Sequence, residues 1–496
     1  MINTQDLSAF GKNDIRGIYG ENVNEELFYY AGKGFIKYIR EKSGLNASDI
    51  WVTVSRDARL HSESLVKVLI KGIVHTGANV VNLDLVPTPL GYYSEFASYP
   101  ENISDEIKIS GALIVTASHN PPEYNGLKMT YDKSSLNEEE IKLVKKYTQE
   151  EMLSDISAVK HGESRLYNII PQYIDSVSSK FPSVGRGIKV VTDSANGTAG
   201  VVAPELYREI GCDVVELFSE PDGNFPNHHP NPSDFSTLKE IREKVLETKA
   251  DVGIAFDGDS DRLGVITSEG EILTGDKLLY IYARDIINDL AKRGETPVIV
   301  SEVKCSQVLY DEINALGGKA VMAKTGHGYI KSKMKETGAI LAGEMSGHMF
   351  FKDRFYGFDD AVYSGCRIIE IIAKNKRINP DFKLSDLLAP FNKVYTMNEV
   401  SHNCKNELKK RVLEKITEKI ESNDYIFGTK INDIVKIDGL RIIFPNGFAL
   451  IRQSNTEPVF TLRFEADNKE NAEHYCNVMI SLLDECISNI AESEEK

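Results

Sequence analysis

The chain lacks the features that mark membrane, secreted and nucleic-acid-binding proteins. No run of eighteen apolar residues occurs, and the first residues do not combine positive charge with an apolar stretch, so neither a membrane span nor an export signal is expected. The 58 Lys and Arg are outnumbered by 74 Asp and Glu, and the net charge of −16 is not offset by any long basic run. We therefore expect no nucleic acid and no membrane as partners.

Cysteine is scarce and irregularly placed. Six cysteines occur in 496 residues, without a C-x-x-C pair or a pairing rhythm. This usage favours reduced thiols in the core of a cytoplasmic protein. The six are Cys212, Cys305, Cys366, Cys404, Cys476 and Cys486.

Length and composition predict a chain that folds over most of its length. The 496 residues suffice for about three or four cores. Hydrophobic residues at 41% and charged residues at 27% are close to the globular average. Up to about residue 300, short β-branched runs alternate with helical stretches, which is typical of βα units around a mostly parallel sheet. The expected strands cover residues 51–54, 80–83, 112–115, 188–191, 252–256, 297–301, 320–323 and 339–342.

The pattern changes after about residue 388. Asn446-Gly447 between two apolar runs indicates a β-hairpin, and residues 459–466 alternate strictly, as an antiparallel strand does. Together with helical periods, this predicts a small α+β unit attached to a larger α/β body. The expected helices cover residues 137–152, 273–290, 403–420 and 471–487.

Polar loops follow several of the predicted strands, where open α/β sheets bind their ligands. In the first loop, Ser118 comes just after the strand at 112–115, and Pro121 prevents that strand from continuing. Such a serine suits an exposed nucleophile or phosphoryl carrier, with His119 and Lys128 near enough to hold anionic oxygens. The alternative is a turn whose polar side chains bond only their own backbone.

The second loop places three alternating carboxylates, Asp257, Asp259 and Asp261, directly after the strand at 252–256. In an extended loop they face the same way and offer oxygen ligands to a hard divalent cation such as Mg²⁺. Arg262 stands where a calcium-binding EF-hand loop needs glycine, and it suits a counter-charge or a phosphate ligand. A solvated acidic turn is the alternative, although three crowded like charges call for compensation.

Two further loops carry hydrogen-bonding and titratable groups. Glu344 and Ser346 are suited to sugar hydroxyls, and His348 to acid or base work; an ordinary turn with a packing histidine is the alternative. In the hairpin unit, a donor cluster suited to a phosphate competes with a plain hydrophilic loop. This cluster comprises Arg452, Ser454, Asn455 and Thr456. Accessory candidates are Arg16, Lys304 and His327, and neither a P-loop nor a G-x-S-x-G elbow occurs.

Taken together, these motifs resemble the α-D-phosphohexomutase family, nearly from end to end of the chain. The order and spacing of the loops are similar to those of its phosphomannomutase/phosphoglucomutase members. The resemblance implies three α/β domains with mixed or parallel sheets and a smaller C-terminal α+β domain around a central cleft. On this basis we expect domain bounds of 1–163, 164–271, 272–387 and 388–496.

The resemblance also implies roles for the loop residues. Ser118 becomes the phosphorylated residue, and one of its phosphoryl oxygens joins Asp257, Asp259 and Asp261 around Mg²⁺. Glu344 and Ser346 bind sugar hydroxyls. The distal phosphate loop comprises Arg452, Ser454, Asn455 and Thr456, and further matching positions are Arg16, Lys128, Arg262, Lys304, His327 and His348. The sequence departs from the family at Ser260, where the metal loop commonly has a second glycine.

The resulting hypothesis is a mutase that interconverts hexose 1-phosphate and hexose 6-phosphate of mannose, glucose or both. Ser118 donates its phosphoryl group, a hexose 1,6-bisphosphate turns over, and the other phosphoryl group returns to Ser118. The acid/base group stays open among His348, Arg16 and Lys128, and His119 is a further catalytic candidate. We expect small sugar phosphates as partners and a monomer, with oligomers left open.

Three alternatives remain at the sequence level. A phosphoglucosamine mutase differs by about one residue in the sugar loop, at Met345. A metal-dependent phosphatase of the haloacid-dehalogenase type would use Asp257 as its nucleophile. A non-catalytic sugar-phosphate sensor would need no intact set of loops.

Overall fold

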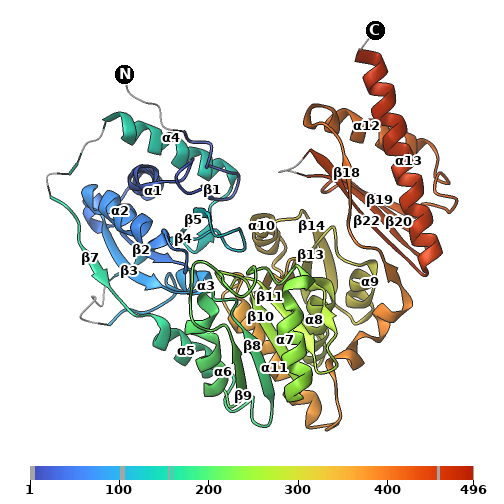
Figure 1. Ribbon diagram of the computed structural model, residues 1–496, viewed down its shortest axis with the longest axis horizontal. Helices are drawn as coiled ribbons and strands as arrows, with labels where there is room; N and C mark the ends of the chain where they lie inside the picture. Colours follow the sequence, from blue (N-terminus) through green and yellow to red (C-terminus); the bar gives the residue numbers. More distant parts are fainter. Residues whose placement is uncertain (1–5, 101–106, 155–156, 159, 455–457, 495–496) are drawn as a thin grey trace. The chain divides into compact units, whose positions relative to one another are not determined.

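The computed structural model describes residues 6–100, 107–154, 157–158, 160–454 and 458–494. The chain divides into two compact units, one of Met1–Thr274 with Ser346–Leu384 and one of Gly275–Met345 with Ser385–Lys496. Figure 1 labels the helices and strands of both units. The four domain boundaries expected from the sequence stay predictions.

The first unit contains two sheets and, in addition, the short strand β16. The first sheet has the order β1-β5-β4-β2-β3-β7 with β6 on β5, and the second has the order β12-β11-β10-β8-β9. The strands are β1 Ile15–Ile18, β2 Trp51–Arg56, β3 Asn79–Leu85, β4 Ile109–Val115, β5 Tyr124–Tyr131, β6 Ser134–Ser135, β7 Ser164–Leu166, β8 Lys189–Asp193, β9 Asp213–Leu217, β10 Val252–Phe256, β11 Leu263–Thr267, β12 Ile272–Leu273 and β16 Met349–Phe351.

The helices of the first unit connect and cover these sheets. The α-helices are α1 Glu25–Ser43, α2 Ser62–His75, α3 Thr88–Tyr93, α4 Glu138–Ser154, α5 Ile170–Ser178, α6 Ala203–Glu209, α7 Lys239–Thr248 and α11 Ala361–Lys376. Short 3₁₀ turns are η1 Ala47–Asp49, η2 Thr198–Val201 and η3 Phe235–Leu238.

Both sheets of the first unit are mixed. In the first, β2 pairs in parallel with β3 and β4, and β5 pairs antiparallel with β4 and β1. In the second, β8 pairs in parallel with β9 and β10, and β11 is antiparallel to β10. The sequence-based expectation of mixed or parallel α/β sheets is therefore confirmed. The antiparallel neighbours arise because β4 and β10 each return through a short loop instead of a crossover helix.

Helices cover both faces where strands run parallel. Successive crossovers from β2 to β3 and from β3 to β4 step in opposite directions across the sheet, so right-handed connections put α2 and α3 on opposite faces. On the second sheet, α7 packs over Val191 and Ala255, and Gly365 of α11 approaches Ile254. Because neighbouring residues of a strand point to opposite faces, α7 and α11 cover opposite faces of this sheet.

The second unit contains a parallel sheet and an antiparallel sheet. The parallel strands have the order β14-β13-β15, and the antiparallel strands have the order β17-β22-β21-β20-β19 with β18 on β22. The elements are α8 Gly275–Ala291, β13 Val298–Glu302, α9 Gln307–Ala315, β14 Lys319–Ala323, α10 His327–Thr337, β15 Leu341–Gly343, η4 Leu384–Lys393, β17 Tyr395–Thr396, β18 Val400–Asn403, α12 Asn406–Ser422, β19 Asp433–Val435, β20 Leu440–Phe444, β21 Gly447–Gln453, β22 Val459–Ala466 and α13 Lys469–Glu494.

The C-terminal sheet is covered on one face by α12 and α13, and apolar side chains of helices and strands share one core (Figure 1). The expected hairpin is present, because β20 pairs antiparallel with β21 across the Asn446-Gly447 turn. This confirms the α+β character that was predicted for the end of the chain.

Two further expectations are confirmed locally. All six cysteines are buried and unbridged. Asn137 caps α4 as expected, because its Oδ1 accepts the N–H groups of Glu139 at 3.0 Å and of Glu140 at 3.1 Å. In the described part of the chain, no helix is long and apolar enough to cross a membrane.

Candidate active site

The acidic loop is the tip of the β10–β11 hairpin. The side chains of Asp257, Asp259 and Asp261 each place one carboxylate oxygen within 4.8 Å of the others, and all three residues are buried. Their convergence does not come from the extended loop that the sequence suggested. It comes from a tight turn in which the N–H of Ser260 donates to the Asp257 carbonyl at 3.1 Å and Ser260 has φ of 66°.

Asp257 is held by the backbone of its own turn. The N–H groups of Asp261 and Arg262 both donate to its Oδ1, each at 3.1 Å. Its other oxygen, Oδ2, accepts a 2.7 Å hydrogen bond from Ser118 Oγ. Burial, followed by the negative charges of Asp261 and Asp259, raises the pKa of Asp257 well above its usual value. Crowding of this kind is relieved when a cation binds.

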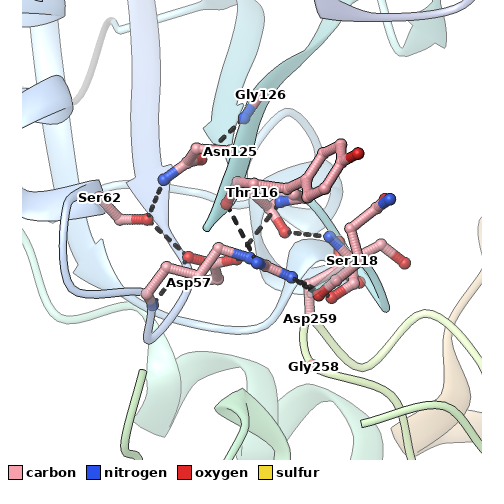
Figure 2. Close-up of polar contacts among 12 residues, drawn as sticks. Asp57, Ser62, Thr116, Ser118, Asn125, Gly126, Gly258 and Asp259 are labelled. Atoms are coloured by element: carbon pink, nitrogen blue, oxygen red, sulfur yellow. Dashed lines mark hydrogen bonds and ion pairs between the residues drawn. The ribbon is translucent and has the colours of Figure 1, made fainter. Parts of the chain in front are cut away.

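Ser118 lies in the connection between β4 and β5. Its N–H donates to Thr116 Oγ1 at 2.9 Å (Figure 2). Its Oγ lies 3.2 Å from His119 Nδ1. The expectation of an exposed serine is wrong in this structure, because Ser118 is only 2% exposed and its hydroxyl is covered by the acidic hairpin. Its φ of 51° lies in the left-handed region, which is costly for a residue with a Cβ and is common at functional turns.

Lys128 brings a buried positive charge to the acidic hairpin. It projects from β5, and its Nζ donates to Oδ2 of Asp259 at 2.7 Å and to Oδ2 of Asp261 at 2.5 Å. Burial opposes its charge, but these two carboxylates outweigh burial and raise the pKa of Lys128 well above its usual value. For Asp261, the charge of Lys128 likewise outweighs burial and holds its pKa well below normal.

Arg16 on β1 reaches the same serine loop. Its Nη1 donates to the Ala117 carbonyl at 3.2 Å and to Asn120 Oδ1 at 2.8 Å, and Asp14 accepts from Nη2 at 2.5 Å. His119 is kept neutral: burial, then the charges of Arg262 and Arg16, lower the pKa of His119 to about 2.

His348 and Ser346 join this cluster within the first unit. Arg262 Nε lies 3.1 Å from His348 Nε2 and donates to it, so the ring proton lies on Nδ1, which is 3.0 Å from Ser346 Oγ. His348 Nε2 is also 3.2 Å from Asp261 Oδ1. The structure thus brings together ten predicted residues in one unit: Arg16, Ser118, His119, Lys128, Asp257, Asp259, Asp261, Arg262, Ser346 and His348.

The remaining predicted residues that the structure describes belong to the second unit. Glu344 is buried, and its Oε1 accepts the Gly326 N–H at 2.7 Å, next to His327 at the start of α10. Lys304 follows β13, and its Nζ lies 3.9 Å from Glu399 Oε2. These contacts place Glu344 and His327 side by side.

Arg452 and Ser454 lie at the end of β21. Arg452 Nε donates to Asp438 Oδ2 at 3.2 Å, and the same oxygen accepts the Thr325 N–H at 3.2 Å. The Ser454 carbonyl accepts from Lys409 Nζ at 2.9 Å. The predicted residues Asn455 and Thr456 lie outside the described residues.

The structure adds residues that the sequence analysis missed. Thr88 Oγ1 donates to Asp259 Oδ2 at 2.7 Å, and Asp359 places a carboxylate oxygen within 4.8 Å of ligand atoms of Asp261 and His348. Asp57 and Arg59 lie beneath the serine loop. Asp57 and Arg59 could have been found from the sequence. The charged stretch Arg56-Asp57-Ala58-Arg59 comes shortly after the predicted strand at 51–54, just as the other candidate loops follow their strands.

The three aspartates fit a hard divalent cation. Lys128 and Thr88 occupy Oδ2 of Asp259, while its buried Oδ1 has no hydrogen-bond partner in the part of the chain that the structure describes. An unsatisfied buried carboxylate oxygen is costly unless a cation or donor reaches it. Three carboxylates at this spacing are the oxygen ligands that Mg²⁺ prefers.

Sequence families match most of the chain. They are described as Phosphoglucomutase/phosphomannomutase, alpha/beta/alpha domain I for residues 7–154, domain II for residues 171–270, domain III for residues 274–394, and C-terminal domain for residues 403–481.

Individual relatives match over nearly their full lengths. A phosphomannomutase/phosphoglucomutase from Pseudomonas aeruginosa is 37% identical over 481 residues, which cover 97% of this chain and 96% of that protein. A phosphoglucomutase from Neisseria gonorrhoeae is 36% identical over 474 residues, with 96% of each chain covered. A solved structure of a phosphoglucomutase/phosphomannomutase family protein from Burkholderia thailandensis has a TM-score of 0.85 at 35% identity and covers 98% of each chain.

Proposed function

Because the chain belongs to the phosphoglucomutase/phosphomannomutase family and is a hexose phosphate mutase, we propose that Ser118 carries the phosphoryl group that the reaction moves. The observation that carries this assignment is the 2.7 Å hydrogen bond from Ser118 Oγ to Asp257 in a buried cluster of carboxylates and cations. A turn serine whose side chain bonds only its own backbone would not require a hydrogen bond to a buried carboxylate.

The proposed reaction has two balanced half-reactions. In the first, the bond between Ser118 Oγ and phosphorus breaks and Oγ takes a proton, while the free 6-hydroxyl of a hexose 1-phosphate bonds to that phosphorus and gives its proton to a base. In the second, the hexose 1,6-bisphosphate has turned end over end, Ser118 Oγ bonds to the C1 phosphoryl group and gives up its proton to the base, and the freed C1 oxygen of the sugar takes a proton. The net result is isomerisation without hydrolysis.

The acidic hairpin is the proposed magnesium site. Asp257, Asp259 and Asp261 would hold the ion, and when bound it draws negative charge away from the transferring phosphoryl oxygens. Lys128 positions the hairpin from one side, since it bonds Oδ2 of both Asp259 and Asp261. The orphaned Asp259 Oδ1 supports this assignment.

The polar residues around Ser118 divide by charge. Arg16, Lys128 and Arg262 are cationic and would balance the charge of a phosphoserine. A pKa lowered to about 2 keeps His119 neutral and makes it a poor proton acceptor, so we propose that it holds a phosphoryl oxygen by a hydrogen bond. We propose His348 as the proton carrier, with Lys128 and Arg16 holding charge.

The residues of the second unit form the proposed substrate side. Glu344 would bind a sugar hydroxyl, and Lys304 and His327 would contact the substrate. Ser346, which belongs to the first unit, is likewise proposed to bind a sugar hydroxyl. Arg452 would bind the phosphate that does not react, with Ser454, Asn455 and Thr456. The pairing of Arg452 with Asp438 supports this, because it presents a partly buried guanidinium that is already oriented.

The test is Ser118→Ala in a mutase assay started with catalytic hexose 1,6-bisphosphate, on the 1-phosphates of mannose, glucose and glucosamine. Turnover should fall by about 10³-fold or more because the phosphoryl carrier is gone. The matched control is Ser134→Ala on exposed β6, which should keep full activity.

Mass analysis of the trapped protein separates the alternatives. Phosphate on Ser118 supports the mutase mechanism, whereas phosphate on Asp257 with release of inorganic phosphate supports a phosphatase. Preference for glucosamine 1-phosphate would make the chain a phosphoglucosamine mutase, and full turnover by Ser118→Ala would refute the proposal.

A further inference from the structure

Arg59 is a buried cation directly beneath the serine loop. It follows β2, is 1% exposed, and forms an ion pair with Asp57 in which Nε donates to Oδ2 at 3.0 Å. Its other side-chain N–H groups all donate to backbone carbonyls of the loop between β4 and β5. Nη2 donates to Ser118 O at 2.9 Å and Asn120 O at 2.6 Å, and Nη1 to Pro121 O at 2.5 Å and Tyr124 O at 3.0 Å.

All five donors of this guanidinium are therefore used, four of them on one short loop. Burying a cation is costly, and a buried ion pair is often no more stabilising than apolar residues of the same volume. Burial accordingly lowers the pKa of Arg59, against the effect of Asp57. The benefit of such an arrangement is geometric, because a rigid planar fork fixes the positions of several acceptors at once.

The contact that matters most is with Ser118. Its φ of 51° is unfavourable for a residue with a Cβ, so the surrounding structure has to hold it there. Thr116 Oγ1 fixes its N–H, and Arg59 Nη2 fixes its carbonyl oxygen, each at 2.9 Å. With both peptide groups fixed, the Oγ stays directed toward Asp257.

Asp57 in turn orients Arg59. Its Oδ1 accepts from the Arg59 N–H at 3.1 Å and from Ser62 Oγ at 2.6 Å, and its Oδ2 lies 3.4 Å from the Ala117 nitrogen, one residue before Ser118. Asn125 Nδ2 donates to Ser62 Oγ at 2.9 Å, so the network returns to β5 (Figure 2). The loop is thus tied at both ends to one buried ion pair.

We propose that Arg59 is a positioning residue for phosphoryl transfer, acting through the backbone of residues 118–124 to hold Ser118 Oγ in its reactive place. It touches no reacting atom, and the inference rests on the proposed role of Ser118. Without the fork, the loop carbonyls separate and Ser118 leaves the left-handed region, which carries its hydroxyl away from Asp257. The contacts to sugar and distal phosphate are made by other residues and stay unchanged.

The test compares Arg59→Lys with Arg367→Lys. Arg367 is an equally buried arginine of the same unit, and it is paired with Asp353 at 2.8 Å and has no part in the proposed site. Both variants keep the charge and lose a planar fork, so both should melt at a lower temperature. Only Arg59→Lys should lose kcat, by about 10²-fold, with KM for glucose 1-phosphate within about threefold of wild type.

A second readout follows the phosphoserine itself. The rate at which α-D-glucose 1,6-bisphosphate phosphorylates Ser118, followed by intact mass, should fall in Arg59→Lys in proportion to kcat and stay at the wild-type rate in Arg367→Lys. If wild type acquires no phosphate on Ser118, the proposed function fails. If wild type is phosphorylated and Arg59→Lys is phosphorylated equally fast, or Arg367→Lys loses as much kcat, the positioning role is refuted.

Discussion

Two serines of the site carry conformations that side chains with a Cβ usually avoid. Ser118 has φ of 51° and Ser260 has φ of 66°, at the turns that follow β4 and β10. Each is held by a hydroxyl of a threonine: Thr116 binds the backbone of Ser118, and Thr198 Oγ1 lies 2.9 Å from Ser260 Oγ. Strained residues persist only where surrounding contacts determine them, so these threonines are part of the site's architecture.

Substitutions at Ser260 should separate backbone strain from its hydrogen bond. Ser260→Ala removes the contact with Thr198 but keeps the Cβ in a left-handed turn, and it should destabilise the protein by about 1 kcal/mol. Ser260→Gly loses the same hydrogen bond but relieves the turn of about 1 kcal/mol of strain, so it should melt near wild type. Thermal melts of both variants check this, and an alanine variant that melts at or above the glycine variant contradicts it.

At the scale of elements, the carboxylate of Asp360 caps the start of α11 and also links this helix to α5. Asp360 Oδ1 accepts the Tyr363 N–H at 2.8 Å as the helix cap, and Oδ2 accepts from the Tyr173 hydroxyl of α5 at 2.7 Å. The residue is 1% exposed. Burial, only partly offset by these hydrogen bonds, raises the pKa of Asp360 to about 7.

This raised pKa predicts a specific pH dependence. The folded protein keeps a proton on Asp360 up to about pH 7, whereas the unfolded chain loses it near 3.8, so the stability from this group is complete below 3.8 and is lost as pH rises to 7. Asp360→Asn keeps the cap and cannot titrate. The melting temperature of Asp360→Asn minus that of wild type should therefore increase from pH 5 to pH 7 and stay constant above pH 7.

The control for this experiment is Asp234→Asn. Asp234 caps an exposed turn, and hydrogen bonds from Ser236 lower its pKa, so its contribution is constant above its usual value of 3.8. The difference between Asp234→Asn and wild type should be flat between pH 5 and pH 8. A flat difference for Asp360→Asn over the same range would show that this carboxyl is already ionised at pH 5.

At the scale of the whole molecule, the predicted site residues divide between the two compact units. Ser118, which we propose as the phosphoryl carrier, lies in the first unit with the acidic hairpin, His119 and His348. The second unit contains Lys304, His327, Glu344 and Arg452. In the first unit, the buried Oδ1 of Asp259 has no hydrogen-bond partner among the described residues. Magnesium should therefore contribute to the stability of the folded chain as well as to the reaction.

Metal binding should raise the melting temperature. At a concentration about 100 times its Kd, Mg²⁺ adds about 2.7 kcal/mol if it binds only the folded state. The shift should disappear in Asp259→Asn, which removes the carboxylate with the orphaned Oδ1, and persist in Glu63→Gln, an exposed acid on α2. Equal shifts in both variants would place the stabilising ion elsewhere.

Much of the fold followed from local patterns. The strands β10 and β22 have the residues that the sequence indicated, because short apolar or alternating runs bounded by turn residues favour strands. The acidic loop, the serine loop and the hairpin loop were found because each follows such a strand. Thr88 and Asp359 were not found, since neither stands in a polar cluster with a recognisable spacing.

The sequence alone indicated many of the strands and helices, the unbridged cysteines and the residues of the candidate site, because these depend on residue type and on spacing along the chain. Only the tertiary structure decided that a turn, and not an extended loop, gathers the aspartates, that Ser118 is buried, and that Arg59 holds its loop. The burial of Ser118 and the role of Arg59 depend on contacts between segments more than fifty residues apart, such as Arg59 with Ser118 and Ser118 with Asp257. No local pattern encodes the distance between such segments.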